Sequence, residues 1–221
     1  MKRRSLPVAA ALAAPAALLT ACVGGDGKSS DDDTVVGTDQ GTETPKKPMK
    51  RTTVPADKPD GVDVSLPKDM DLVFDWDKPK DQNEAVAMDN AANFFRAIHL
   101  AVNKRTTKGA AVASYATGSG LKYAQTQSEA WVRGGWTATG TLRHCDVTTR
   151  SVENGTSVEV AICADSRKFY GKEVRTGKIL TTDPSIDDFD CFKIIMVRRP
   201  KAERLWQASK VFVETKAAKC R

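Results

Sequence analysis

The chain has 221 residues, 40% of them hydrophobic, and a formal net charge of +6. It contains two histidines and five cysteines, and no two cysteines have C-x-x-C spacing, which disfavours a zinc site. The absence of a G-x-S-x-G motif, together with so few histidines, disfavours a Ser-His-Asp hydrolase. We therefore expect no metal and no cofactor.

Residues 1–21 have the organisation of a secretory signal peptide. Lys2, Arg3 and Arg4 give a basic start, and an apolar stretch from Val8 to Leu19 follows. This stretch is about a dozen residues long, whereas a helix that spans a bilayer needs about 20. The sequence therefore predicts a leader rather than a stable transmembrane helix.

The leader ends in Leu19-Thr20-Ala21-Cys22, which resembles a bacterial lipobox. The resemblance implies that Cys22 receives a diacylglyceryl thioether and becomes the first residue of the mature chain. Two acyl chains anchor a protein stably, where one chain binds only marginally. The alternative is a conventional cleaved signal peptide with a spare cysteine. We expect the lipoprotein, held at the extracytoplasmic face of the cell membrane.

Residues 22–83 predict a disordered tether rich in Asp, Thr, Lys and Pro. Low hydrophobicity and mixed charge do not offset the entropy lost on ordering. The stretch VDVSLPKDMDLVFDW, residues 62–76, carries apolar side chains, so docking on the domain and a free tether both stay open. The tether has nine basic and fourteen acidic residues and a net charge of −5.

Residues 84–221 predict one folded domain with 22 basic and 14 acidic residues, a net charge of +8. This length is enough to bury one core. A basic surface serves solubility, or it attracts anionic envelope polymers or lipid headgroups.

Hydrophobic periodicity predicts helices first and strands afterwards. Apolar residues at spacings of three and four indicate helices over residues 84–104, 108–115 and 119–133. After Gly135 the period becomes two, and Asn154-Gly155 predicts a type I′ hairpin turn. The predicted strands and hairpins cover residues 136–153, 156–166, 168–180, 191–199 and 204–216. Helices followed by an antiparallel meander make an α+β domain.

This order resembles the nuclear transport factor two-like (cystatin-like) fold, in which a curved antiparallel sheet wraps around helices as a cone. It is similar, more narrowly, to a group of actinobacterial lipoproteins and secreted proteins built on that fold. The resemblance covers residues 88–220. The residues that carry it are FFRAI (94–98), SYATGSGL (114–121), CADS (163–166), Trp206 and Cys220.

Four cysteines remain once Cys22 is lipidated, and an even number in an exported chain predicts two disulfides. A two-residue turn at Asn154-Gly155 places Cys145 opposite Ala164 and Cys163 opposite Asp146. The cysteines of this hairpin then lie on opposite faces and cannot bond to each other without a bulge or a change of register. We predict the pairs Cys163–Cys220 and Cys145–Cys191.

Enzymes of this fold, such as steroid isomerases and polyketide cyclases, work in the mouth of the cone. Polar residues expected near such a pocket are His144, Asp146 and Asp165, with Tyr115, Tyr123 and His99 as further candidates. The same alternation is typical of any half-exposed strand, so we assign no catalytic residue.

A basic cluster is predicted at the tip of the last hairpin. Its members are Arg198, Arg199, Lys201 and Arg204. With Trp206 nearby, this tip is suited to an anionic polymer, although such tips are commonly just solvated. Nucleic acid is not expected as a partner outside the membrane.

Two hypotheses of function follow. The first is a non-catalytic, lipid-anchored domain that binds a ligand or an envelope partner through the cone or the basic tip. The second is an isomerase- or cyclase-type enzyme with a small apolar substrate. An enclosed pocket with a buried, perturbed carboxylate or histidine favours the enzyme, and a pocket plugged by side chains favours the binding domain.

Overall fold

The computed structural model describes residues 62–152, 155–200, 202 and 204–221. The signal peptide, Cys22 and residues 22–61 of the expected tether lie outside these ranges. Within the described ranges, no helix has the length and apolar character needed to cross a membrane.

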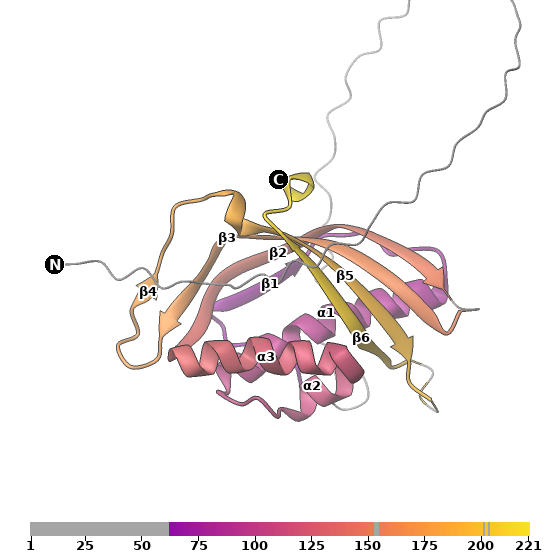
Figure 1. Cartoon of the computed structure of the whole chain (residues 1–221), viewed down its shortest axis with the longest axis horizontal. Helices are drawn as coiled ribbons and strands as arrows, with labels where there is room; N and C mark the ends of the chain where they lie inside the picture. The colour runs from indigo at the N-terminus through magenta and orange to yellow at the C-terminus, as the bar shows by residue number, and fades with distance from the viewer. Residues whose placement is uncertain (1–61, 153–154, 201, 203) are drawn as a thin grey trace, which may run out of the picture. The chain divides into compact units, whose positions relative to one another are not determined.

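The domain is α+β, with three helices on one face of a six-stranded sheet (Figure 1). The strands follow the order β1-β2-β3-β5-β6, and the short β4 pairs with β3. The helices are α1 (Gln82–Asn103), α2 (Ala110–Tyr115) and α3 (Gly118–Gly134). The strands are β1 (Met70–Phe74), β2 (Trp136–Val152), β3 (Ser157–Glu173), β4 (Ile179–Leu180), β5 (Phe189–Arg198) and β6 (Trp206–Thr215). Two 3-10 turns, Ile186–Asp188 and Ala218–Cys220, complete the fold.

The predicted helices are confirmed because their apolar stripes face the sheet. The Asp81 side chain caps α1 by accepting a hydrogen bond from the backbone N–H of Glu84 at 2.9 Å. Apolar residues of α1, among them Met88 and Phe94, are fully buried in the core. α3 ends at Gly135, whose φ of +77° is the left-handed conformation typical of a helix C-terminus.

The stretch 62–76 docks on the domain. β1 pairs in parallel with β2, from Met70 opposite Gly140 to Phe74 opposite His144. Val64, Leu72 and Phe74 are buried in the core. The sheet is therefore mixed rather than purely antiparallel. The domain extends N-terminal to residue 84, where the sequence alone had placed its start.

The hairpin of β2 and β3 contains an irregularity that the sequence did not predict. Its outer ends follow the expected register, with Trp136 opposite Glu173 and Val152 opposite Ser157. Between them the register shifts by one residue, so that Cys145 faces Cys163 and not Ala164. Asp146, at the edge of the shifted segment, has a φ of +49°, which is unusual outside glycine and fits a β-bulge.

One of the two predicted disulfides is present. Cys163 and Cys220 are bonded, and this confirms the first pair. Cys145 and Cys191 are free thiols, so the second pair is wrong. The reason is the register: Cys145 and Cys191 face Cys163 from opposite sides, on β2 and β5. Two strand spacings separate them, about 9–10 Å, which is beyond the reach of a disulfide.

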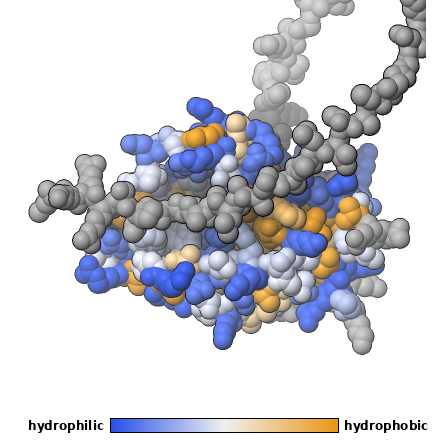
Figure 2. Space-filling view, viewed as in Figure 1, coloured by the Kyte–Doolittle hydropathy of each residue, from blue (hydrophilic) through white to orange (hydrophobic). Residues whose placement is uncertain are grey.

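One face of the molecule is largely hydrophilic, with smaller apolar areas between the polar ones (Figure 2). The large hydrophobic residues that remain exposed in the described part are Val174, Ile179, Phe212 and Val213.

α3 approaches β6 so closely that only glycine fits at one position. A β-carbon on Gly120 would overlap the backbone carbonyl of Ala208. Two hydrogen bonds hold this contact: the Thr117 backbone N–H donates to Ala208 at 3.0 Å, and the Ser119 hydroxyl donates to the Ser209 carbonyl at 2.9 Å. The first turn of α3 is thus held against the edge strand β6 by these hydrogen bonds.

Replacing Gly120 with alanine is expected to destabilise the domain by about 1–3 kcal/mol, because α3 must move away from β6. Gly109→Ala is the matched control, since a β-carbon there meets neighbours at 3.6 Å or more, an ordinary contact. We expect the control to change the free energy of unfolding by less than about 1 kcal/mol. Urea unfolding measures both, and equal effects would contradict the close contact.

Candidate functional site

A cavity of about 360 Å³ lies between the helices and the inner face of the sheet. α1 and α3 supply one side of it, and β2, β3, β5 and β6 supply the other. Most of the wall is apolar. The apolar lining residues are Phe95, Ile98, Val102, Trp131, Leu142, Ala164, Phe169, Phe192 and Val213. Trp131 belongs to the wall, and the disulfide lies elsewhere, so neither plugs the cavity.

His144 is the most deeply buried polar group of this cavity, with an exposed fraction of 0%. Its ring stacks on Phe74 at 4.7 Å and contacts Phe95 at 4.5 Å between ring centroids. Neither ring nitrogen has a hydrogen-bond partner in the described part of the chain. Burial, with a smaller effect of His99, lowers the pKa of His144 to about 3. The backbone of Val73 lies near enough to the ring to favour the charged form, but it does not meet the geometry of a hydrogen bond. His144 is therefore a neutral imidazole.

His99 lies on α1 and lines the same cavity. Its ring meets Phe169 edge to face, with 5.1 Å between the centroids. The Nδ1 atom is buried and finds no hydrogen-bond partner among the described residues. Burial lowers the pKa of His99 to about 4.

Two acidic groups of the wall, Asp190 and Tyr123, have shifted pKa values. The other polar lining residues are Gln127, Ser166, Asp188 and Thr215. Burial raises the pKa of the Asp190 carboxyl, while the backbone of Lys216 opposes the shift. Burial, followed by the charge of Asp190, raises the pKa of Tyr123 to about 12. Each group is thus held closer to its neutral form than in water.

This arrangement is suited to a small, mainly apolar molecule with a polar end. A neutral imidazole has one donor and one acceptor nitrogen. A buried polar atom without a partner costs free energy, and a ligand that supplies the missing hydrogen bond removes that cost. The two histidines therefore offer binding energy to a hydroxyl or carbonyl group in a cavity whose wall is mostly apolar.

The structure separates the three pocket residues suggested by the sequence. His144 lines the cavity, whereas Asp146 and Asp165 do not. At Asp146 the bulge turns the side chain outward, where it accepts a contact from the Cys145 thiol at 3.7 Å. The register shift places Asp165 opposite Arg143, one residue from His144 and therefore on the other face of the sheet. Of the further candidates, Tyr123 and His99 line the cavity and Tyr115 is buried in the core.

Asp190 is a polar cavity residue that the sequence analysis missed. The signal available was an acidic residue beside an otherwise apolar strand, between Phe189 and Cys191. Acidic residues also occur in the preceding turn, so the pattern does not distinguish a strand residue from a loop residue.

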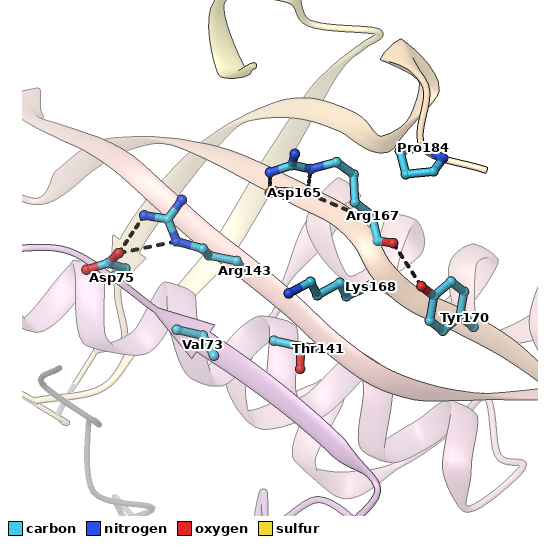
Figure 3. Close-up of a pocket in the computed structure, with 9 residues that line it drawn as sticks. All are labelled: Val73, Asp75, Thr141, Arg143, Asp165, Arg167, Lys168, Tyr170 and Pro184. Atoms are coloured by element: carbon cyan, nitrogen blue, oxygen red, sulfur yellow. Dashed lines mark hydrogen bonds and ion pairs between the residues drawn. The ribbon is translucent and has the colours of Figure 1, made fainter. Parts of the chain in front are cut away.

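A second hollow, of about 550 Å³, lies on the outer face of the sheet (Figure 3). Four of its five charged groups are paired with each other, and the fifth, Lys168, has no ion pair within the described part of the chain. Arg143 donates to Asp75 through two nitrogens, at 2.5 and 3.2 Å. Arg167 donates to both carboxylate oxygens of Asp165, at 2.6 and 2.9 Å, and this lowers the pKa of Asp165. Since its arginines are neutralised in this way, the hollow is a weaker candidate than the inner cavity.

The basic tip is exposed but contributes to the fold through its backbone. Arg198, Arg199 and Arg204 have exposed side chains, and Lys201 lies outside the described residues. The backbone carbonyl of Arg204 accepts a hydrogen bond from the side chain of Asn90 at 3.2 Å.

Among the residues that the structure describes, one group of three cysteines has the proximity of metal ligands. The sulfurs of Cys163, Cys191 and Cys220 lie within 4.8 Å of one another. Two of these sulfurs are bonded to each other, so they are not available as thiolate ligands in this state.

No protein-family model matches the chain, and no curated protein matches it significantly. Among solved structures, the intermembrane space region of the chloroplast protein ARC6 is similar, with 10% sequence identity and a TM-score of 0.39. The match covers 62% of this chain and 99% of that one. A similarity at this level supports no conclusion about family or function.

The buried histidines predict that the domain loses stability in mild acid. Both pKa values are lowered by folding, so the unfolded chain binds protons near pH 6.5 while the folded chain does not. The free energy of unfolding should fall as the pH drops below about 6.5, by about 2 kcal/mol per histidine at pH 5. His144→Leu should remove half of this loss. Urea midpoints that stay constant between pH 7 and pH 5 would contradict the buried, neutral state.

Proposed function

We propose that the chain is a lipid-anchored extracytoplasmic protein whose domain is a nuclear transport factor two-like cone that binds a small, mainly apolar ligand. Helices that precede the long strands, and a cavity between those helices and the sheet, support the cone. The lipobox-like Leu19-Thr20-Ala21-Cys22 supports the anchor. A basic domain on such an anchor would lie close to anionic polymers of the envelope.

The observation that carries the ligand-binding proposal is a set of three buried imidazole nitrogens without a partner in the described chain: both of His144 and the Nδ1 atom of His99. They line a cavity with predominantly aromatic and aliphatic walls, the composition typical of small-molecule sites. A flat apolar molecule with one hydroxyl or carbonyl group matches both features.

A second function, an isomerase- or cyclase-type enzyme, is favoured by Asp190. A carboxylate whose pKa is raised in an apolar cavity is suited to proton transfer. Binding requires only the cavity and its hydrogen-bonding groups, whereas catalysis also requires Asp190 to reach the reacting carbon. The assay is conversion of a β,γ-unsaturated ketone to its conjugated isomer. A measurable rate that falls about 100-fold or more in Asp190→Asn would establish the enzyme in place of the binding domain.

The binding proposal predicts that 2-naphthol, an apolar bicyclic alcohol, quenches the fluorescence of Trp131 in the cavity wall. Val213→Trp places a large side chain where β6 lines the cavity, and it should weaken binding at least about tenfold, or 1.4 kcal/mol. Val174→Trp is the matched control, because this valine is also exposed but lies outside the cavity lining. Equal affinity of the two variants would contradict binding in the cavity.

The anchor predicts a mature chain that begins at a diacylated Cys22. Intact mass of the protein from the producing cell tests this, and the chain should partition into the detergent phase of Triton X-114. Cys22→Ser should move the protein into the aqueous phase, whereas Cys191→Ser should leave the partition unchanged. A native chain without lipid, cleaved at another residue, would refute the anchor.

A further inference from the structure

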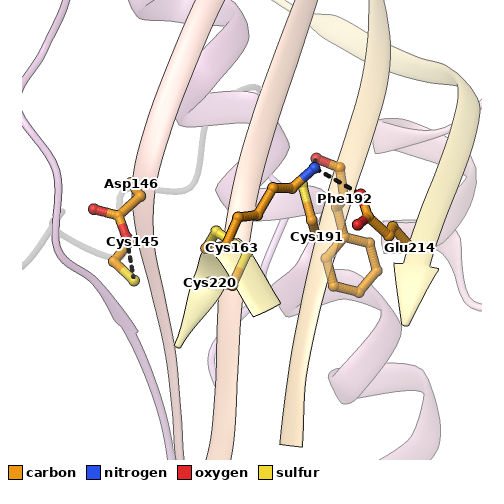
Figure 4. The surroundings of a disulfide bond; sticks show 8 residues. Cys145, Asp146, Cys163, Cys191, Phe192, Glu214 and Cys220 are labelled. Atoms are coloured by element: carbon orange, nitrogen blue, oxygen red, sulfur yellow. Dashed lines mark hydrogen bonds and ion pairs between the residues drawn. A yellow bond between two sulfur atoms is a disulfide. The ribbon is translucent and has the colours of Figure 1, made fainter. Parts of the chain in front are cut away.

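Three cysteines form a row across the sheet, on the face opposite the cavity (Figure 4). Cys163 on β3 lies directly opposite Cys145 on β2 and directly opposite Cys191 on β5. Directly opposite residues point to the same face of a sheet, so the three side chains lie side by side. Cys220, from the turn Ala218–Cys220, reaches this row and is bonded to its middle member.

Cys191 is placed to compete for Cys220. Its sulfur lies within 4.8 Å of both sulfurs of the Cys163–Cys220 bond, and it is a free thiol. Sulfur at this distance from a disulfide is close to the contact needed for thiol–disulfide exchange. The geometry thus gives Cys220 two neighbours, only one of which it can bond at a time.

The surroundings favour Cys191 over Cys145 as the attacking thiol. Cys191 is half-buried and lies beside the ammonium group of Lys219. The pKa of Lys219 is raised, chiefly by its hydrogen bond to Glu214 and further by the charge of Cys191. Cys145 is buried, and burial raises the pKa of its thiol. Burial suppresses formation of the reactive thiolate at Cys145, whereas Cys191 is more accessible and its sulfur lies close to the disulfide.

We propose that these four cysteines form a thiol–disulfide exchange site, through which the oxidised protein reaches the pairs Cys191–Cys220 and Cys145–Cys163. In the first step the Cys191 thiol loses a proton and its sulfur attacks Cys220. The Cys191–Cys220 bond forms, the Cys163–Cys220 bond breaks, and Cys163 leaves as a thiolate that takes up a proton. No electron is gained or lost in this step.

The second step is an oxidation. Cys145 and Cys163 lose two protons and two electrons to a disulfide oxidant, such as oxidised glutathione, which is reduced to two thiols. Opposite residues of antiparallel strands have Cα atoms about 4.5–5.5 Å apart, within the range of a disulfide. The Cys145 sulfur, now turned toward Asp146, reaches Cys163 by rotation of its side chain.

The two states differ in which elements of the fold their disulfides link. In the first state the C-terminal turn is tied to β3, and in the second it is tied to β5 while β2 is tied to β3. The second state uses all four cysteines, so an exported protein would have no free thiol in this row.

The pairing can be mapped directly, because trypsin cleavage separates the four cysteines. The peptides run over residues 144–150, 151–167, 179–193 and 220–221. The full chain, extracted from membranes without reductant, is equilibrated with glutathione buffers of increasing oxidised fraction. Free thiols are alkylated, and the disulfide-linked peptides are identified by mass spectrometry.

We expect Cys163–Cys220 at the reducing end of the series, replaced by Cys191–Cys220 and Cys145–Cys163 in the oxidised samples. The proposal is overturned if Cys163–Cys220 persists throughout while Cys145 and Cys191 remain alkylated.

Cys191→Ser tests which thiol begins the exchange. This variant should keep Cys163–Cys220, with Cys145 alkylated, at every glutathione ratio. Appearance of Cys145–Cys163 in this variant would show that Cys191 is not required and would overturn the mechanism. Mapping of the unaltered protein decides the pairing even if the variant does not fold.

Discussion

The register of β2 against β3 is the constraint on which both faces of the sheet depend. A shift of one residue in pairing moves a side chain to the opposite face. Two irregularities, one between Thr141 and Arg143 and the bulge near Asp146, confine the shift to the middle of the hairpin, so the ends of the strands keep the register set by the turn. Within that middle segment, His144 points into the cavity and Cys145 points away from it.

The cavity and the cysteine row share the same strands as a result. Each cysteine of the row is the chain neighbour of a residue that lines the cavity: Cys145 follows His144, Cys163 precedes Ala164, and Cys191 precedes Phe192. A change of pairing in the row would pull on the backbone that carries the cavity wall. The proposed ligand site and the proposed exchange site are thus two faces of one piece of sheet.

Much of the fold could be predicted from local patterns. The period of the apolar residues located α1, α2 and α3, and the change of period at Gly135 located the start of β2. These features depend on neighbouring residues, so one sequence contains them. The parallel pairing of β1 could not be predicted, because its partner lies some 70 residues away and its apolar residues suited docking and a free tether equally.

The candidate site was predicted only in part, and the reason is again the bulge. An even register placed Asp146 and Asp165 with His144, and no feature of the sequence around Asp146 signals a residue with positive φ. The same even register made Cys145–Cys163 seem excluded and led to the wrong second disulfide. Asp190 was missed because its environment is created by helix α3 and strand β6, which are distant in sequence.

The central claim is that neutral histidines in the cavity hold the polar end of a ligand. Nitrogen NMR of the imidazoles tests it most directly, since the chain has two histidines and one variant assigns both. Titration with 2-naphthol should shift the nitrogen signals of His144 and His99 as their missing hydrogen bonds form. Saturable binding that leaves both imidazoles unchanged would contradict the account, because the ligand would then lie elsewhere.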